Sequence, residues 1–346
     1  MDFLELLMSH ALAGRRMPIG LFRFRITPLQ TLFVPGVNKG NMLRGGFGQA
    51  FRRLCCIPQC RDSRSCPLNT PCPYREVFEP SPPAGAESLS KNRDIPRPFV
   101  FRAPKTQKTR FEIGEPFEFE LVLIGRAFEF LPYFVLSFRE LAAEGLGLNR
   151  AKCILERVDE ISLSQNAAPQ VSQPEVVYTA EEQIFRATRA LSMDEWITSR
   201  CQNSCEVNDG VQTLAIRFVT PTFLRADGEV IHHPKFHHVF KRVRDRINAL
   251  STFYGDGPLN ADFHALGNRA EGVRTISCAV KWVERFRTSS KTRQRHELSG
   301  FVGEATYKGE LADLLPWLLV GELVHVGKHT AWGNGWIDLR KAANGN

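Results

Sequence analysis

The chain has 346 residues, of which 43% are hydrophobic and 24% are charged, and its formal net charge is +8. This length exceeds what one hydrophobic core usually needs, so two domains are expected, and the basic balance favours polyanionic partners such as nucleic acid. No apolar run reaches the roughly 18 residues of a membrane span, and no basic segment precedes the apolar residues of the N-terminus, as it would in a signal peptide. We therefore expect a cytoplasmic protein with no membrane partner and without disulfides.

The first half of the chain alternates strand-like and helix-like segments. Strands show apolar and polar residues in alternation, whereas helices show apolar residues three and four positions apart. Strands are predicted at 19–27, 97–103, 117–125 and 152–163, and helices at 41–54 and 130–145. The order strand, helix, strand, strand, helix, strand is that of a ferredoxin-like βαββαβ domain, which we assign to residues 1–165.

Cysteines are concentrated in an insertion at residues 55–75 of this first domain, which holds five of the nine in the chain. Thiolates at short spacing can close a tetrahedral zinc site. The usual Cys-x-x-Cys pair is missing, however, so a structural zinc and a reduced, proline-rich loop are equally open interpretations. The predicted zinc ligands are Cys56, Cys60, Cys66 and Cys72.

The second half repeats the order of the first. Residues 166–210 are predicted to be a linker or surface excursion, because their first part is polar and rich in Ser, Gln and Pro. Strands follow at 211–225, 273–287, 300–311, 322–327 and 335–339, with helices at 234–255 and 311–319. Pro316 is expected to bend or break the second helix unless it falls in the first turn. Residues 211–346 are therefore assigned to a second ferredoxin-like domain, and the fold class is α+β.

A glycine-rich segment near the C-terminus reads "GELVHVGKHTAWGNGWIDL". It is not a nucleotide-hydrolysing P-loop, because Gly321 and Gly327 are one position too far apart and Lys328 is not followed by Ser or Thr. Two interpretations stay open. Glycine amides and Trp332 could hold the phosphates and a base of nucleic acid, or the glycines could merely turn a hairpin with both tryptophans in the core. The candidate nucleic-acid contacts are His325, Gly327, Lys328, Trp332, Gly333 and Gly335.

Basic side chains gather in two further places. The predicted helix 234–255 carries them on both flanks of its apolar stripe, and residues 281–295 hold six Lys or Arg against one Glu. Most charged helix faces are simply solvated, but with the net charge of +8 these patches indicate a polyanion track with salt-sensitive binding. The candidate contacts are Lys241, Arg242, Arg293 and Arg295.

A histidine cluster, "HHPKFHH", places four histidines between His232 and His238. Such a cluster could bind a metal, could supply the acid and base of RNA cleavage, or could be an accident of the surface. The sequence shows no carboxylate constellation that would hold catalytic magnesium. We therefore expect no cofactor for catalysis.

Several of these segments together resemble a known family. "TRQRHELSGFVGEATYKGEL" and "GELVHVGKHTAWGNGWIDL" resemble the C-terminal domain of the CRISPR-associated precursor-crRNA-processing endoribonucleases, members of the RAMP superfamily. "RINALSTFYGDG", "LRGGFGQAFRRLCC" and "CPYREVFEP" fit the same pattern. The resemblance covers most of Gly210 to Leu339, with scattered pieces nearer the N-terminus. It implies tandem RAMP- or RRM-like ferredoxin domains and CRISPR repeat RNA as the partner, with the glycine-rich loop holding that RNA.

The resemblance also implies metal-independent cleavage of precursor crRNA. In that chemistry the ribose 2′-hydroxyl attacks the neighbouring phosphate, which leaves a 2′,3′-cyclic phosphate and a 5′-hydroxyl. Such enzymes often place a general-base histidine near the first helix of the N-terminal domain, yet no histidine occurs here between His10 and His232. Candidate catalytic residues are therefore Lys39 and Arg44 by electrostatic stabilisation, or His237 and His238 from the second domain.

Two alternatives to a crRNA-maturing endoribonuclease follow from the same observations. The missing N-terminal histidine is compatible with a non-cleaving RNA-binding RAMP subunit that associates with other CRISPR effector subunits. The cysteine insertion is compatible with a zinc-dependent nucleic-acid module whose main contact is that loop.

Overall fold

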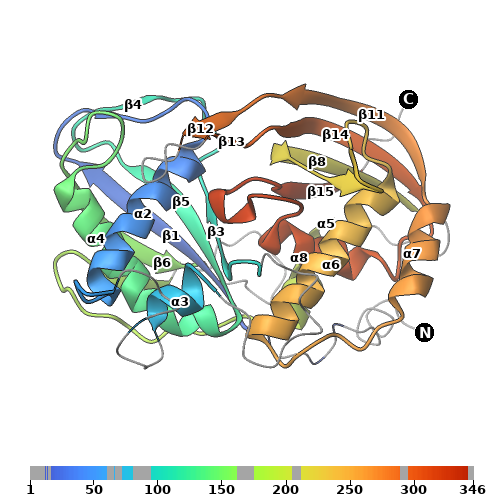
Figure 1. Ribbon diagram of the computed structural model, residues 1–346, viewed down its shortest axis with the longest axis horizontal. Helices are drawn as coiled ribbons and strands as arrows, with labels where there is room; N and C mark the ends of the chain where they lie inside the picture. The colour runs from blue at the N-terminus through green and yellow to red at the C-terminus, as the bar shows by residue number, and fades with distance from the viewer. Residues whose placement is uncertain are drawn as a thin grey trace. The chain divides into compact units, whose positions relative to one another are not determined.

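The computed structural model describes Leu12, Gly14, Cys66 and residues 17–60, 72–80, 95–161, 175–204, 212–288 and 295–341. The chain divides into two compact units (Figure 1). The N-terminal unit consists of Met17–Leu191 with Phe253–Gly255, and the C-terminal unit of Met1–Arg16, Ser192–Thr252 and Asp256–Asn346. None of the helices in the described part of the chain has the length and apolarity that crossing a membrane would require.

The N-terminal unit is built on an antiparallel sheet of five strands in the order β3-β5-β1-β6-β7. The strands are β1 (Ile19–Pro28), β3 (Phe99–Arg102), β5 (Phe117–Ile124), β6 (Cys153–Glu160) and β7 (Glu175–Thr179). Phe24 of β1 pairs with Phe119 of β5 on one side and with Val158 of β6 on the other. All three side chains are buried, so the register turns one face of the sheet into the core.

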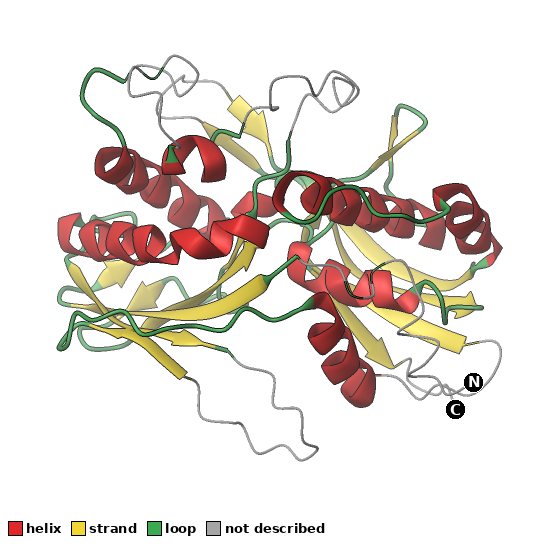
Figure 2. Cartoon of the chain, turned by 90° about the horizontal axis from the view of Figure 1, so that it is seen from below, coloured by secondary structure: helices red, strands yellow, loops and turns green. Residues whose placement is uncertain are grey.

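Helices α2 (Lys39–Cys55) and α4 (Leu131–Glu144) cover one face of this sheet (Figure 2). A phenylalanine cluster joins them, with the rings of Phe47 and Phe134 stacked at 4.5 Å. Glycines allow the close approach: a Cβ on Gly46 would lie 2.6 Å from Leu141, and one on Gly48 would lie 2.4 Å from Phe78. Gly46 and Gly48 of α2 therefore serve packing. Smaller elements complete the unit: β2 (Leu32–Phe33), β4 (Arg110–Phe111), α3 (Pro73–Val77) and η3 (Gly125–Phe130).

The C-terminal unit is built on a four-stranded antiparallel sheet in the order β11-β14-β8-β15. Its strands are β8 (Gln212–Thr222), β11 (Arg274–Val283), β14 (Gly300–Gly309) and β15 (Ile337–Lys341). Its helices are α5 (Met193–Ser204), α6 (Phe236–Tyr254), α7 (Phe263–Gly272) and α8 (Leu315–Val324). Two small hairpins, β9 (Arg225–Ala226) with β10 (Glu229–Val230) and β12 (Phe286–Thr288) with β13 (Arg295–Glu297), and the turn η4 (Thr330–Trp332) complete it.

Both sheets have the strand order of a ferredoxin-like domain, in which the first and third strands are central and neighbouring. In the N-terminal unit β7 adds a fifth strand beside β6. The prediction of an α+β fold with tandem ferredoxin-like domains is confirmed.

One local prediction in the C-terminal unit was wrong. Residues 322–327 are not a strand, because helix α8 continues to Val324 and the chain then enters the glycine-rich loop. Pro316 meets the exception stated for it, because it lies in the first turn of this helix, where no intrahelical amide bond is lost.

The segment predicted as a linker, 166–210, contains two regular elements among its described residues. Strand β7 pairs with β6, and helix α5 packs against α8 and β15. The helix is fixed by long-range contacts: Trp196 donates its indole N–H to the carbonyl of Leu319 at 2.7 Å, and Arg200 forms a two-pronged ion pair with buried Glu322. Local sequence composition carries no sign of such partners.

Candidate functional site

The glycine-rich loop, residues 325–336, adopts a strained backbone that only glycine tolerates at several points. Gly327, Gly333 and Gly335 all have positive φ angles, of +83°, +83° and +73°. A Cβ on Gly327 would lie 2.4 Å from the carbonyl oxygen of Phe223, and one on Gly335 only 1.8 Å from that of Val326. Positive φ angles favour glycine at all three positions, and close backbone packing also requires it at Gly327 and Gly335.

The backbone amides of this loop are directed inward. Gly335 donates to the carbonyl of Pro221 at 3.0 Å, Gly333 to that of Thr330 at 2.8 Å, and Lys328 to that of Phe223 at 3.2 Å. These amides therefore hold the loop together, and the expectation that Gly333 and Gly335 contact phosphates through theirs is corrected.

His325 is also internal. Its side chain is fully buried, its Nδ1 lies 3.0 Å from the carbonyl oxygen of Asn334, and its ring stacks on Trp336. This burial is inconsistent with the predicted RNA contact, because the side chain already fills the interior of the loop. The sequence pattern could not separate this histidine from an exposed one.

Three side chains of the loop are outside this packed interior. Lys328 is exposed, with its ammonium 5.3 Å from the ring centre of Phe223. Trp332 and His329 are half-buried and stack at 4.7 Å, and Arg287 lies 5.1 Å from the Trp332 ring. The loop therefore presents a cation and a ring pair, so that Lys328 and Trp332 are the predicted residues with accessible side chains.

The histidine cluster forms part of a pocket of about 150 Å³ in the C-terminal unit. We call it the histidine pocket; it is lined by Arg225, Ala226, Asp227, His237, His238, Lys241, Arg242 and Glu271. The first turns of α6 supply the histidines and Lys241, the β9–β10 hairpin supplies Arg225 and Asp227, and α7 supplies Glu271. Three elements thus meet where sequence reasoning had named only the helix.

The two imidazoles of the histidine pocket lie side by side, with ring centres 4.3 Å apart. Burial lowers the pKa of both histidines, and Lys241 lowers that of His237 further while His237 lowers that of His238. The Nδ1 atom of His238 is buried and has no hydrogen-bond partner within the described residues. Both rings are therefore held toward the neutral form, in which one ring nitrogen can accept a proton.

The basic residues of the pocket are fixed by short contacts. Lys241 pairs with Glu271 at 2.6 Å, and Arg242 donates to the carbonyl of Arg225 at 3.1 Å. Arg225, Asp227 and Glu271 were missed from the sequence. The sequence did contain a signal for the hairpin that carries Arg225 and Asp227, because "DG" is typical of a two-residue hairpin turn. Asp227 and Gly228 both have the positive φ that this turn requires.

The N-terminal candidates have structural partners. Lys39 is 4% exposed and donates its ammonium to the carbonyls of Gly36 and Thr106, at 3.2 and 2.9 Å. Burial lowers its pKa. The guanidinium of Arg44 lies 4.6 Å from the ring centre of Phe78. The Lys39 side chain therefore ties two loop carbonyls together, and catalysis by Lys39 through electrostatic stabilisation stays a prediction.

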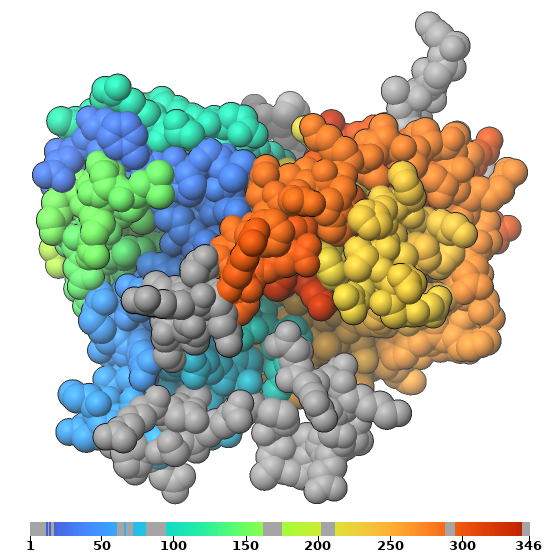
Figure 3. All heavy atoms as spheres, turned by 45° about the horizontal axis from the view of Figure 1, so that its top comes forward, coloured from blue at the N-terminus to red at the C-terminus, as the bar shows by residue number. Residues whose placement is uncertain are grey.

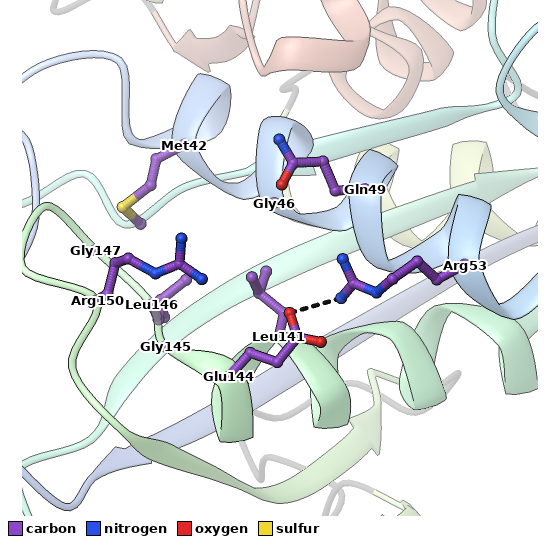
Figure 4. A pocket seen from close by; sticks show the side chains of 10 residues that line it. All are labelled: Met42, Gly46, Gln49, Arg53, Leu141, Glu144, Gly145, Leu146, Gly147 and Arg150. Carbon is purple, nitrogen blue, oxygen red and sulfur yellow. Dashed lines mark hydrogen bonds and ion pairs between the residues drawn. The ribbon is translucent and has the colours of Figure 1, made fainter. Parts of the chain in front are cut away.

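A second pocket, of about 190 Å³, lies in the N-terminal unit between α2 and the end of α4 (Figure 4). Arg53 from α2 forms an ion pair with Glu144 at 2.6 Å, and the Arg150 side chain extends into the same space from the loop after α4. Among the described residues that line it there is no histidine. The pocket offers positive charge but no group suited to accept a proton near pH 7.

The remaining predicted residues lie elsewhere. Arg293 falls outside the described residues, and Arg295 lies 3.8 Å from the ring centre of Phe286 on the β12–β13 hairpin. Burial, then the nearby thiols of Cys60 and Cys72, raises the pKa of Cys56 to about 11. Within the described residues, no group of three or more His, Cys, Asp or Glu side chains is arranged to hold a metal ion.

The described part of the chain thus consists of two ferredoxin-like units, and the second carries a packed glycine-rich loop before its last strand. A family model described as an N-terminal domain matches residues 17–190, half of the chain, and the model of the CRISPR-associated endoribonuclease Cas6 matches residues 216–337. The second match identifies the C-terminal part of the chain as a domain of the Cas6 type of CRISPR-associated endoribonuclease. No curated protein matched the sequence.

Solved structures share the fold at low sequence identity. The product complex of a Thermus thermophilus Cas6 is 14% identical with a TM-score of 0.50, covering 92% of this chain and 98% of the other. A partial Cas6-RT-Cas1–Cas2 complex is 10% identical with a TM-score of 0.57, covering 97% of this chain and 48% of the other. At these identities the likeness shows the fold alone.

Proposed function

We propose that this protein cleaves CRISPR repeat RNA within precursor crRNA, using the histidine pocket as its active site. The 2′-hydroxyl would give its proton to a base while its oxygen attacks the adjacent phosphorus. The bond from phosphorus to the 5′-oxygen then breaks, and that oxygen takes a proton from an acid. The products are a 2′,3′-cyclic phosphate and a 5′-hydroxyl, and no cofactor takes part.

The residues of the pocket fit these roles. A histidine with a lowered pKa is mostly neutral at pH 7 and can accept the 2′-hydroxyl proton. Its neighbour, once protonated, can donate to the leaving oxygen. Arg225 and Arg242 supply positive charge for the pentavalent phosphorane, where charge develops. The observation that carries the proposal is the pair of imidazoles 4.3 Å apart within a basic pocket.

Cleavage of repeat RNA in the presence of EDTA tests the proposal. The wild-type protein should release a fragment whose 5′-hydroxyl polynucleotide kinase labels without prior phosphatase treatment. His237→Ala and His238→Ala should each lower the single-turnover rate by roughly 10²- to 10⁴-fold, the usual contribution of a general acid or base. His233→Ala, at an exposed neighbouring position, is the matched control and should cleave like the wild type.

A non-cleaving RNA-binding subunit of a CRISPR effector complex is the second candidate function. It is favoured by the absence of histidine from the sequence between His10 and His232, since similar enzymes often carry their base in that region. Tight, salt-sensitive binding of every repeat RNA tested, with the RNA left intact by the wild-type protein, would support this function over cleavage.

Structural zinc at Cys56, Cys60, Cys66 and Cys72 stays a prediction. Support comes from the thiols of Cys56, Cys60 and Cys72, which lie near enough to influence one another's pKa. Metal analysis of protein purified without chelator should find one zinc per chain. Substitution of Cys60 with Ser should remove it, whereas Cys153→Ser, at a buried cysteine on β6, should not. Metal-free wild-type protein would refute the site.

A further inference from the structure

An aromatic cluster lies at one end of the sheet in the C-terminal unit. The rings of Trp282 and His232 are 4.4 Å apart at 47°, and Phe223 lies 6.0 Å from Trp282. Phe223 is buried, Trp282 is half-buried and His232 is exposed. The cluster therefore begins in the core and ends at the surface with an indole and an imidazole.

Strand β11, which carries Trp282, is the edge strand of its sheet, and most of its side chains are exposed. An indole on an exposed edge strand contributes less to the stability of the fold through burial than an indole in the core. Exposed aromatic rings are typical of surfaces that contact a partner. In Figure 3 the yellow residues of the β9–β10 region and the orange residues of β11 lie next to each other on the same face of this unit.

Two cations flank the aromatic cluster. The Lys328 ammonium lies 5.3 Å and the Arg225 guanidinium 5.9 Å from the ring centre of Phe223. Both side chains are exposed, and neither is paired with a carboxylate among the described residues. Lys328 is held at this position by its own amide, which donates to the Phe223 carbonyl. Positive charge is therefore positioned beside the rings by the glycine-rich loop and by the β9–β10 hairpin.

Arg225 links this surface to the histidine pocket. It lines the pocket, and its backbone carbonyl accepts the hydrogen bond from Arg242, while its guanidinium lies over Phe223. A nucleotide whose phosphate lies in the pocket would therefore have aromatic rings within reach of a neighbouring base. Proteins that bind single-stranded nucleic acid combine aromatic rings, which stack with bases, and cations, which contact phosphates.

We propose that Trp282 and His232 form a stacking site for an unpaired RNA base, with Lys328 and Arg225 contacting the flanking phosphates. The site deepens the proposed function, on which it rests for the identity of the RNA. It assigns a single-stranded segment, rather than a helical stem, to the surface beside the histidine pocket, because a base within a duplex has no free face to stack on an indole.

Two short RNA probes test the stacking site without any cleavage. The first is a ten-nucleotide oligoadenylate, and the second has the same backbone with abasic riboses. Oligoadenylate should quench tryptophan fluorescence in the wild type, and the quenching should fall in Trp282→Phe. Trp282→Ala should raise the Kd for oligoadenylate about tenfold, as for the loss of one base–aromatic stack, and leave the Kd for the abasic probe unchanged.

Further variants guard against misfolding and non-specific effects. His232→Ala removes an exposed ring and should weaken oligoadenylate binding even if Trp282→Ala does not fold. Lys328→Gln should weaken the binding of both probes, because both carry phosphates. Phe185→Ala, at an exposed phenylalanine of the N-terminal unit, is the aromatic control and should bind like the wild type.

The stacking site is refuted if quenching persists in Trp282→Phe and the oligoadenylate Kd is unchanged in both Trp282→Ala and His232→Ala. Its failure is separable from that of the proposed function. A wild-type protein that leaves repeat RNA uncut but stacks oligoadenylate through Trp282 would keep the site and refute the cleavage. If the wild type cleaves repeat RNA and the variants bind oligoadenylate like the wild type, the cleavage is supported and the stacking site is refuted.

Discussion

At the scale of single residues, the adjacent histidines of the pocket have an environment that disfavours their charged forms. Burial is the main cause, and the neighbouring positive charges of Lys241 and of the second imidazole add to it. This environment suits a general base, and it also couples the stability of the fold to pH. The effect on stability can be measured without any RNA.

Acidification should destabilise the protein through these two histidines. Their folded pKa values lie below the unfolded value of about 6.5, so the unfolded chain binds protons first as the pH falls. The free energy of unfolding should therefore decline from pH 7 to pH 5, and the His237→Gln/His238→Gln double variant should show a shallower decline. Urea denaturation at several pH values measures both.

His233→Gln serves as the control for this pH series, because the side chain of His233 is exposed to water. It should retain the wild-type decline. An identical decline in the wild type and the double variant would mean that the pocket does not hold its histidines neutral.

The contacts of single residues could be predicted from sequence where neighbours in sequence are neighbours in space. His237 and His238 adjoin on one helix turn, so their pairing was visible in the sequence. The partners of Lys39 and His325 could not be predicted, because they are distant or internal: Lys39 reaches the carbonyl of Thr106, and His325 is enclosed by the loop that follows it. Charge and residue type indicate candidates, whereas burial decides which of them can meet a substrate.

At the scale of elements, helix α2 shows what its glycines contribute. The "RGGFG" run contains Gly45, which has open space around it, and Gly48, which packs against the ring of Phe78. Packing therefore requires glycine at Gly48, whereas at Gly45 there is room for a larger side chain. Helix propensity favours alanine at both, and only packing opposes it at Gly48.

Gly48→Ala should therefore lower the free energy of unfolding by about 1–3 kcal/mol, the usual cost of overpacking a core. The new methyl group would lie 2.4 Å from the Phe78 ring. Gly45→Ala, three residues earlier in the same helix, should raise stability by up to about 1 kcal/mol. Equilibrium urea unfolding compares the two, and equal effects in both variants would contradict the packing explanation.

Element prediction from sequence was most reliable where periodicity is strong. All the strands and helices assigned to the first domain are present, and so are the long helix and central strands of the second. Helix α5 was not predicted, because its apolar pattern is weak. Its anchors, Trp196 and Arg200, form hydrogen bonds with residues of α8 that lie more than a hundred positions away in sequence. The end of α8 was assigned to a strand because a short apolar run has the same appearance in either structure.

At the scale of the whole molecule, the net charge of +8 should make RNA binding depend strongly on salt. The Kd for repeat RNA should rise steeply between 50 and 200 mM salt, on the order of the 10³-fold expected for several phosphate contacts. Lys328→Gln should reduce the slope of log Kd against log salt by about 0.7, the contribution of one phosphate contact on a single strand. Fluorescence anisotropy at four salt concentrations measures the slope.

Lys308→Gln is the matched control for the salt series. Lys308 is exposed and lies near the end of β14 that is distant from Trp282. Trp282 pairs with Phe301 at one end of β14, whereas Lys308, at the other end, pairs with Arg274. The slope should be unchanged in this variant. An equal change in both variants would show that binding responds to total charge alone and not to the surface beside the aromatic cluster.

The tandem arrangement itself was predictable, because the same order of elements occurs twice and no long-range information is needed to see it. The two sites in the C-terminal unit were not fully predictable, because each joins elements through side chains that composition does not connect. Trp282 and His232 are fifty positions apart in sequence, and only the pairing of β11 with β14 brings the indole to the end of the sheet.

The histidine pocket has a consequence for the order of folding. All of its lining residues come from one continuous stretch, Arg225 to Glu271, so closing it requires only short chain loops. The glycine-rich loop instead depends on β15 pairing with β8, where Ile337 meets Phe218 across more than a hundred residues. Local contacts form faster than distant ones. A nascent or refolding chain should therefore assemble its proton-transfer site early, and acquire its Lys328 contact surface only after the last strand has joined the sheet.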